Sequence, residues 1–140
     1  MATRHASAQW NGTLKEGNGK MRYGNYEGNY SFSSRFEEGP GTNPEELVGA
    51  AISGCYSMFL SALLSGENLK PERIETTATI QLERDDRGPI ITKIDLDCKA
   101  KVANISKAEF LKHAGKAKEN CPISRLYQGT TINLKAELVG

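Results

Sequence analysis

The chain has 140 residues, the size of one ordinary domain, and its 18 basic and 17 acidic residues leave a formal charge of +1. Because charges of both signs are spread along the chain without a basic run, the composition argues against nucleic acid or an acidic membrane as the main partner. The first ten residues, MATRHASAQW, contain no apolar stretch of the kind found in secretory signals, so we expect a cytoplasmic protein.

The first 36 residues are rich in glycine, asparagine, tyrosine and serine, and turn-forming pairs such as Asn11-Gly12 and Gly24-Asn25 interrupt them. Such pairs connect the strands of β-hairpins, because glycine and asparagine adopt the backbone angles that tight turns require. We therefore predict four short strands, at residues 4–10, 13–16, 20–23 and 29–36.

A loop over residues 37–43 precedes a long helix, which is predicted from Pro44 to about Ser65. Asn43 is a favourable N-cap, Pro44 suits the first helical position, and Glu46 follows the cap by three residues. Residues 47–66 include no charged side chain but several glycines and serines, so we expect a core helix, buried on most sides, and not a membrane span. Its main apolar face is predicted to consist of Leu47, Ala51, Cys55, Met58 and Ala62, widened by Val48, Ile52, Phe59 and Leu63.

The second half of the chain alternates between strand and helix patterns. Residues 74–82 and 94–102 predict a hairpin with one buried face, closed by a turn at residues 85–88. Ser106 opens a second helix, and Pro122 ends it and starts a short further turn, which puts Cys121 at or next to an N-cap. A last strand is predicted at residues 131–138. Helices on largely antiparallel sheets indicate an α+β fold, in one domain over residues 1–140.

The three cysteines differ in their predicted surroundings. An odd number in a reducing compartment argues against a fixed disulfide framework and favours transient pairing. Cys98 falls among the inward-facing residues of a strand, where a free cysteine behaves as a small apolar side chain. Cys55 lies deep in the most apolar helix, so it is either a core residue or needs a cation from elsewhere to become reactive. Cys121 either fills a helix junction or presents its sulfur to free N–H groups at the next helix start.

Patterns for other kinds of site are absent from the sequence. No spacing of histidine and cysteine resembles a zinc site, and there is no phosphate-binding loop and no serine-centred elbow. His5 and His113 are both expected at the surface. We therefore expect neither a metal nor an organic cofactor.

Two segments carry a specific resemblance: GPGTNPEELVGAAISGCYSMFLSALL at residues 39–64 and AKENCPISRLY at residues 117–127. With the preceding SFSSRFEEG and the order of the elements, they resemble the OsmC/Ohr family of osmotically inducible and organic hydroperoxide resistance proteins, and its OsmC branch in particular. The resemblance spans essentially the whole chain. It implies an α+β fold that forms an intertwined homodimer with two active sites near the subunit interface.

The resemblance also implies a role for each of four residues. Cys55 corresponds to the peroxidatic cysteine and Cys121 to the resolving one, while Arg35 matches the arginine that stabilises the thiolate and polarises the peroxide. Glu45 matches the glutamate that pairs with this arginine. The implied activity is that of an antioxidant peroxidase, which reduces organic hydroperoxides, and hydrogen peroxide in some members, through a Cys55 sulfenic acid and a Cys55–Cys121 disulfide. A lipoyl-type dithiol is the implied reductant.

Helix geometry bears on how such a site is assembled. Glu45 and Cys55 are ten residues apart on the predicted helix, about 15 Å along its axis, and they point in directions about 80° apart. They can hardly share one pocket within one chain. If both serve one site, one of them comes from a partner subunit, so we expect an obligate dimer.

A second reading of the same residues is a module without turnover, in which the cysteines sense redox state or hold an apolar ligand. Met58 and Phe59 are candidates to line a pocket for an alkyl group, although core packing is their default role. The presence of Arg35 and Glu45 favours the enzyme. Consumption of many equivalents of peroxide would distinguish the enzyme from the sensor.

Overall fold

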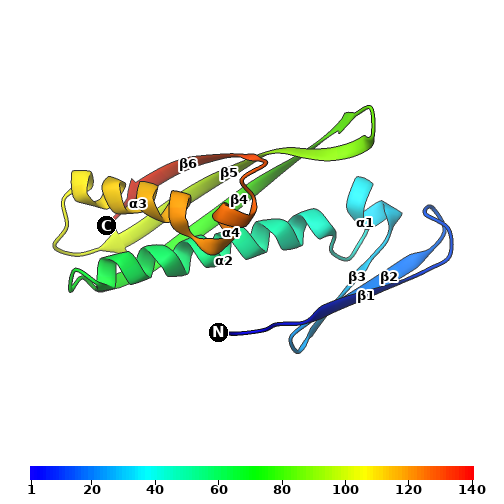
Figure 1. Cartoon of the computed structure of the whole chain (residues 1–140), viewed down its shortest axis with the longest axis horizontal. Coiled ribbons are helices and arrows are strands. Elements are labelled where there is room, and N and C mark those ends of the chain that lie inside the picture. Colours follow the sequence, from blue (N-terminus) through cyan, green and yellow to red (C-terminus); the bar gives the residue numbers. More distant parts are fainter. The chain divides into compact units, whose positions relative to one another are not determined.

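The structure, a computed structural model, describes residues 1–140 and divides into two compact units, Met1–Leu47 and Val48–Gly140. Figure 1 shows the chain coloured along its sequence. The elements are α-helices and two three-stranded sheets, one sheet in each unit, so the predicted α+β class is confirmed.

The first unit contains an antiparallel sheet in which each strand pairs with the next along the chain. Its strands are β1 (Ala6–Asn11), β2 (Asn18–Tyr23) and β3 (Tyr26–Tyr30). The short helix α1 (Phe32–Phe36) follows β3. The predicted hairpins are therefore present, with strand boundaries that differ by a few residues.

One predicted strand in this unit, at residues 13–16, is wrong, and so is most of another, at residues 29–36, of which only residues 29–30 lie in β3. Residues 13–16 form the turn between β1 and β2, and residues 32–36 form α1. The helix begins there because Ser31 caps it: the Ser31 hydroxyl accepts a hydrogen bond from the Ser34 N–H, and the Ser34 hydroxyl accepts one from the Ser31 N–H. The turn-forming pairs suggested a strand here, but these caps satisfy the backbone as a helical turn.

The second unit consists of a sheet in the order β4-β5-β6 together with three helices. Its elements are α2 (Pro44–Ser65), which begins at the end of the first unit, β4 (Pro71–Asp85), β5 (Gly88–Val102), α3 (Lys107–Asn120), α4 (Pro122–Leu126) and β6 (Thr131–Leu138). The Asn43 side chain caps α2 by accepting from the Glu46 N–H at 2.8 Å, and the Ser106 hydroxyl accepts from the Glu109 N–H at 3.1 Å, so both predicted caps are confirmed.

The central strand β5 pairs antiparallel with β4 and parallel with β6. Every second residue of β5 from Ile94 to Val102 is buried, so one face of the sheet is the core face. That face packs with residues of α2 and α3 in a single core cluster, and Figure 1 shows both helices along the sheet. The Tyr56 hydroxyl of α2 donates to the Ala114 carbonyl oxygen of α3 at 3.3 Å, which ties the two helices together.

The buried face of α2 differs from the predicted one. The buried residues are Gly49, Ile52, Tyr56, Leu60 and Leu64. Ala51, Met58 and Ala62, which were assigned to the apolar face, are exposed. By length and composition alone, with a mean hydropathy of 1.8, the helix could cross a membrane. Only 28% of its apolar stretch is buried in this chain, so the prediction that α2 is buried on most sides is wrong. Since α2 is apolar all round, its sequence did not specify which stripe packs on the sheet.

Candidate active site

Cys55 and Cys121 meet in the second unit, although 66 residues separate them in the sequence. Cys55 is partly buried in the middle of α2, and Cys121 is fully buried at the junction between α3 and α4. Cys121 lies close enough to Cys55 to raise the pKa of the Cys55 thiol, and both cysteines are free. Two neighbouring free thiols are the groups from which a disulfide can form.

The environment of Cys55 within this chain disfavours the thiolate. Burial raises the pKa of the Cys55 thiol most strongly, and the neighbouring Cys121 raises it further. The Ile123 backbone opposes the rise through a hydrogen bond to the Cys55 sulfur. Because a nucleophilic cysteine reacts as the thiolate, a positive charge beside Cys55 would favour its reaction.

Cys121 is fixed by its place between two helices. Its N–H donates to the Ala117 carbonyl oxygen at 3.0 Å, closing α3, while its sulfur accepts from the Ser124 N–H at 3.4 Å, opening α4. The thiol also donates to the Ser124 hydroxyl at 3.1 Å. Pro122 occupies the first position of α4, where a missing N–H costs nothing. The predicted placement of Cys121 at an N-cap is confirmed.

Arg35 and Glu45 form an ion pair in the first unit. Arg35 Nε donates to Glu45 Oε1 at 2.8 Å and Nη2 donates to Oε2 at 3.2 Å, a bidentate arrangement. The Glu45 side chain is only 12% exposed and that of Arg35 is 35% exposed. The pair occupies two of the five N–H donors of the guanidinium, so a planar cation held in place by a carboxylate remains able to bind a second anionic or polar oxygen.

Cys98 lies in the core, as its alternating strand predicted. It is fully buried on β5 and pairs in register with Thr76 and Ala136. Burial raises the pKa of the Cys98 thiol, although hydrogen bonds with Tyr56 and Thr76 partly offset this effect. The net effect is a raised pKa, so this environment disfavours a thiolate at Cys98.

His113 is a correction to the expected surface position. Its side chain on α3 is buried, with neither ring nitrogen in a hydrogen bond, and Nε2 lies 3.8 Å from Glu67 and 4.0 Å from Glu109. It faces the core side of α3 because it follows the buried Phe110 by three positions and precedes the buried Ala117 by four. His5 is exposed, as expected. No group of three or more histidine, cysteine, aspartate or glutamate residues is arranged to hold a metal ion.

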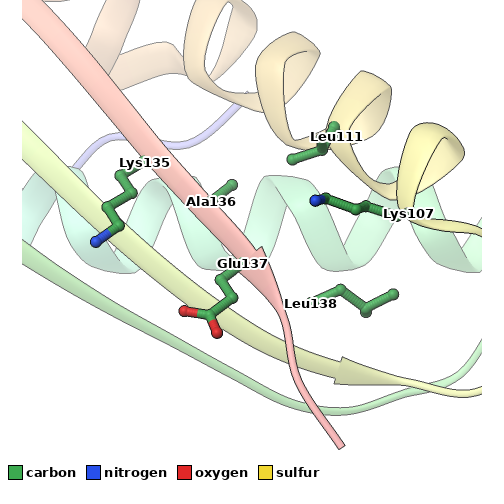
Figure 2. A pocket seen from close by; sticks show the side chains of 6 residues that line it. All are labelled: Lys107, Leu111, Lys135, Ala136, Glu137 and Leu138. Carbon is green, nitrogen blue, oxygen red and sulfur yellow. The ribbon is translucent and has the colours of Figure 1, made fainter.

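Two surface hollows in the second unit lie away from the thiols. One, of about 450 Å³, lies between α3 and β6, where Lys107 and Leu111 face residues 135–138 (Figure 2). The other, of about 350 Å³, lies beside α2. It is lined by Gly54, Ser57, Met58 and Ser61 of that helix and by residues 71–74. Met58 is exposed there, whereas Phe59 packs against the core. No cysteine lines either hollow.

Sequence reasoning missed three of the groups around the thiols: Ser124, the Ile123 N–H and Tyr56. The signal for Ser124 was present, because it follows the N-cap Cys121 by three residues, the spacing of a capping partner. Tyr56 was overlooked because the predicted apolar face of α2 did not include it. The Ile123 N–H is a backbone group and has no signature in the sequence.

Comparisons with known proteins find related sequences and structures with the same fold. Residues 37–135 match the sequence profile of the family described as OsmC-like protein. The chain is 40% identical to Peroxiredoxin OsmC of Escherichia coli (strain K12) over 134 residues, covering 94% of this chain and 89% of that protein. It is 32% identical over 104 residues to the Organic hydroperoxide resistance protein-like 1 of Staphylococcus epidermidis, covering 73% of this chain and 74% of that protein.

A crystal structure of an OsmC-like protein from Mycoplasma pneumoniae superposes with a TM-score of 0.79 at 14% identity, covering 99% of both chains, and so shares the fold.

Proposed function

The chain belongs to the OsmC-like family, and from this premise we propose that it is a thiol-dependent peroxidase that reduces organic hydroperoxides and, as a second substrate, hydrogen peroxide. The observation that carries the proposal is the proximity of two free cysteines, Cys55 and Cys121, from helices far apart in the sequence. The relatives named as a peroxiredoxin and as an organic hydroperoxide resistance protein support this substrate class.

Cys55 is the peroxidatic residue in this proposal. Its thiolate attacks the distal oxygen of the hydroperoxide and the O–O bond breaks, so the sulfur is oxidised to a sulfenic acid and the peroxide is reduced to an alcohol, or to water. Cys55 suits this role better than Cys121 because it is partly exposed, whereas the Cys121 side chain is fully buried.

Cys121 resolves the intermediate. Its sulfur attacks the Cys55 sulfenic acid, the S–O bond breaks, and the products are one disulfide and one water. An external dithiol then restores both thiols by exchange and leaves as its own disulfide. We propose a lipoyl-type dithiol for this step, and a cytoplasmic location, where a catalytic disulfide is reduced between turnovers.

The Arg35–Glu45 pair supplies the positive charge that Cys55 lacks. Within one chain Glu45 stands about 15 Å before Cys55 along α2, since each of ten residues adds 1.5 Å. We therefore propose that the pair of one subunit serves the Cys55 of its partner, in a homodimer with two equivalent sites. We also propose that residues 1–140 act as one domain, whose active site is complete only in the dimer.

The test is steady-state peroxide consumption with excess dithiothreitol, then with a lipoyl dithiol and with thioredoxin. The wild-type protein is expected to consume many equivalents, with organic hydroperoxides the better substrates, and Cys55→Ser is expected to fall to the rate of buffer. Consumption of one equivalent or none by the wild type would instead indicate a redox sensor. Full activity in Cys55→Ser would overturn the proposed role of Cys55.

A further inference from the structure

The Ser124 hydroxyl is buried against the Cys121 sulfur. The two atoms are 3.1 Å apart, and the thiol of Cys121 donates to the hydroxyl oxygen. The Ser124 N–H also points at this sulfur, at 3.4 Å. One residue thus contacts the reacting atom of Cys121 through both its side chain and its backbone.

The start of α4 contacts both sulfurs of the pair. The Ile123 backbone hydrogen-bonds the Cys55 sulfur and the next N–H, that of Ser124, hydrogen-bonds the Cys121 sulfur. Pro122 before them has no N–H to offer. Consecutive residues of the CPIS segment therefore lie beside the two sulfurs, and Ser124 adds a side-chain hydrogen bond to that of Cys121.

The hydroxyl of Ser124 can adapt to the protonation state of its partner. A serine hydroxyl both accepts and donates, so it accepts from the Cys121 thiol and can rotate to donate to a Cys121 thiolate. A hydrogen bond to a charged sulfur is stronger than one to a neutral thiol. We propose that Ser124 is a further catalytic residue, which stabilises the negative charge on the Cys121 sulfur whenever that sulfur attacks or leaves.

During reduction of the disulfide, this role of Ser124 depends on which sulfur is attacked and which one leaves. The inference rests on the proposed disulfide chemistry. In a Cys55–Cys121 disulfide the Cys55 sulfur is the more accessible, because Cys121 is fully buried. The thiolate of an external dithiol attacks Cys55, the Cys55–Cys121 bond breaks, and Cys121 departs as the thiolate that Ser124 receives. The second thiol of the reductant then releases Cys55 as a thiol, and the reductant leaves as a cyclic disulfide.

The experiment measures reduction of a disulfide made with diamide, so it does not depend on peroxide turnover. Wild type, Ser124→Ala and Ser124→Thr are oxidised, the Cys55–Cys121 linkage is verified by peptide mapping, and reduction by excess dithiothreitol is followed by rapid quenching across pH. Ser124→Ala is expected to slow reduction about tenfold, because a hydrogen bond to a developing charge is lost. Ser124→Thr, which keeps the hydroxyl, is expected to stay within about threefold of the wild type.

Ser57→Ala is the matched control, since it removes a partly buried hydroxyl that hydrogen-bonds Thr76 at 2.7 Å and not a cysteine. It is expected to leave the reduction rate unchanged. The inference is overturned if Ser124→Ala reduces as fast as the wild type, if Ser124→Thr is as slow as Ser124→Ala, or if diamide forms no Cys55–Cys121 disulfide. Peroxide turnover by the wild type decides the proposed function separately, so the two can fail independently.

Discussion

The sulfur of Cys121 is surrounded by groups that fix its position, whereas the sulfur of Cys98 is surrounded by the core. Cys121 caps α4 and contacts Ser124, in reach of Cys55, while Cys98 lies between neighbouring strands beside Tyr56 and Thr76. These surroundings support the proposal that Cys121, and not Cys98, is the partner of Cys55.

Replacing Cys121 should separate the two chemical steps. In Cys121→Ser the first reaction of Cys55 is retained, but no disulfide follows, so the Cys55 sulfenic acid persists and excess peroxide oxidises it to sulfinic acid. Mass spectrometry after peroxide addition should show about 16 or 32 mass units added at Cys55. Cys98→Ser serves as the control and should keep steady-state turnover; equal loss of turnover in both variants would contradict the assignment.

Replacing Arg35 should shift the pH dependence of the Cys55 reaction. Burial raises the pKa of the Cys55 thiol, and a nearby cation lowers it, so without the cation the thiolate forms only at higher pH. Arg35→Ala should move the pH profile of the peroxide reaction upward by roughly one to three units and slow it about tenfold or more at neutral pH. Stopped-flow measurement of the first turnover checks this.

Arg22→Ala is the matched control, because Arg22 also pairs with a glutamate in the first unit, Glu27, at 2.7 Å. That pair is half exposed on a sheet, and its loss should leave the pH profile unchanged. An equal shift in both variants would show that the net charge of the protein, and not the Arg35–Glu45 pair, sets the pH dependence of the Cys55 reaction.

Sequence reasoning at the residue scale reached the four proposed site residues through the resemblance, and the structure adds the contacts among them. These groups were missed for the same reason, since each depends on how helices are placed. Ser124 and the Ile123 N–H lie near the sulfurs because a short helix begins there, and His113 is buried because that face of α3 packs on the core. These are consequences of packing, which a single sequence encodes only weakly.

At the scale of elements, α2 shows what periodicity can and cannot specify. Its start at Pro44 and its end at Ser65 follow from local signals and were predicted. Its buried face was not, because apolar residues surround the whole helix and the choice of stripe depends on the shape of the sheet it meets. Similarly, the Ser31 cap forms α1 where the turn signals of the first 36 residues suggested a strand.

The buried stripe of α2 predicts that its leucines contribute more to stability than exposed leucines elsewhere in the chain. Leu60 is fully buried in the core cluster, so Leu60→Ala should lower the free energy of unfolding by about 2–5 kcal/mol through lost burial and the cavity left behind. Leu126→Ala removes the same atoms at a position that is 71% exposed and should change it by about 0.5 kcal/mol or less. Urea unfolding of both variants checks this, and equal destabilisation would contradict the assigned core.

At the scale of the whole molecule, the alternating sequence patterns did not determine whether β6 pairs parallel or antiparallel with β5. The strand pattern of residues 131–138 is the same for either direction. The chain crosses from one end of β5 to the other through α3 and α4 before it enters β6, so β6 runs parallel to β5. This crossover also carries Cys121 back toward α2, where Cys55 lies.

Hybrid dimers test whether each site is built from two subunits. If the Arg35 of one subunit serves the Cys55 of the other, a dimer of one Arg35→Ala chain and one Cys55→Ser chain has one intact site. After mixing equal amounts under conditions that exchange subunits, activity should rise to about a quarter of the wild-type level, since about half of the dimers are hybrids. Each variant alone should stay near background. No recovery despite confirmed subunit exchange would place Arg35 and Cys55 of one site in the same chain.

The central claim, that Cys55 and Cys121 form the catalytic pair, is tested most directly by one measurement. Fully reduced protein receives one equivalent of an organic hydroperoxide, the remaining thiols are blocked with an alkylating reagent under denaturing conditions, and the peptides are mapped by mass spectrometry. We predict one alcohol released per chain, a disulfide joining Cys55 to Cys121, and Cys98 recovered as the alkylated thiol. A disulfide that includes Cys98, or three alkylated thiols with the hydroperoxide unconsumed, would contradict the account.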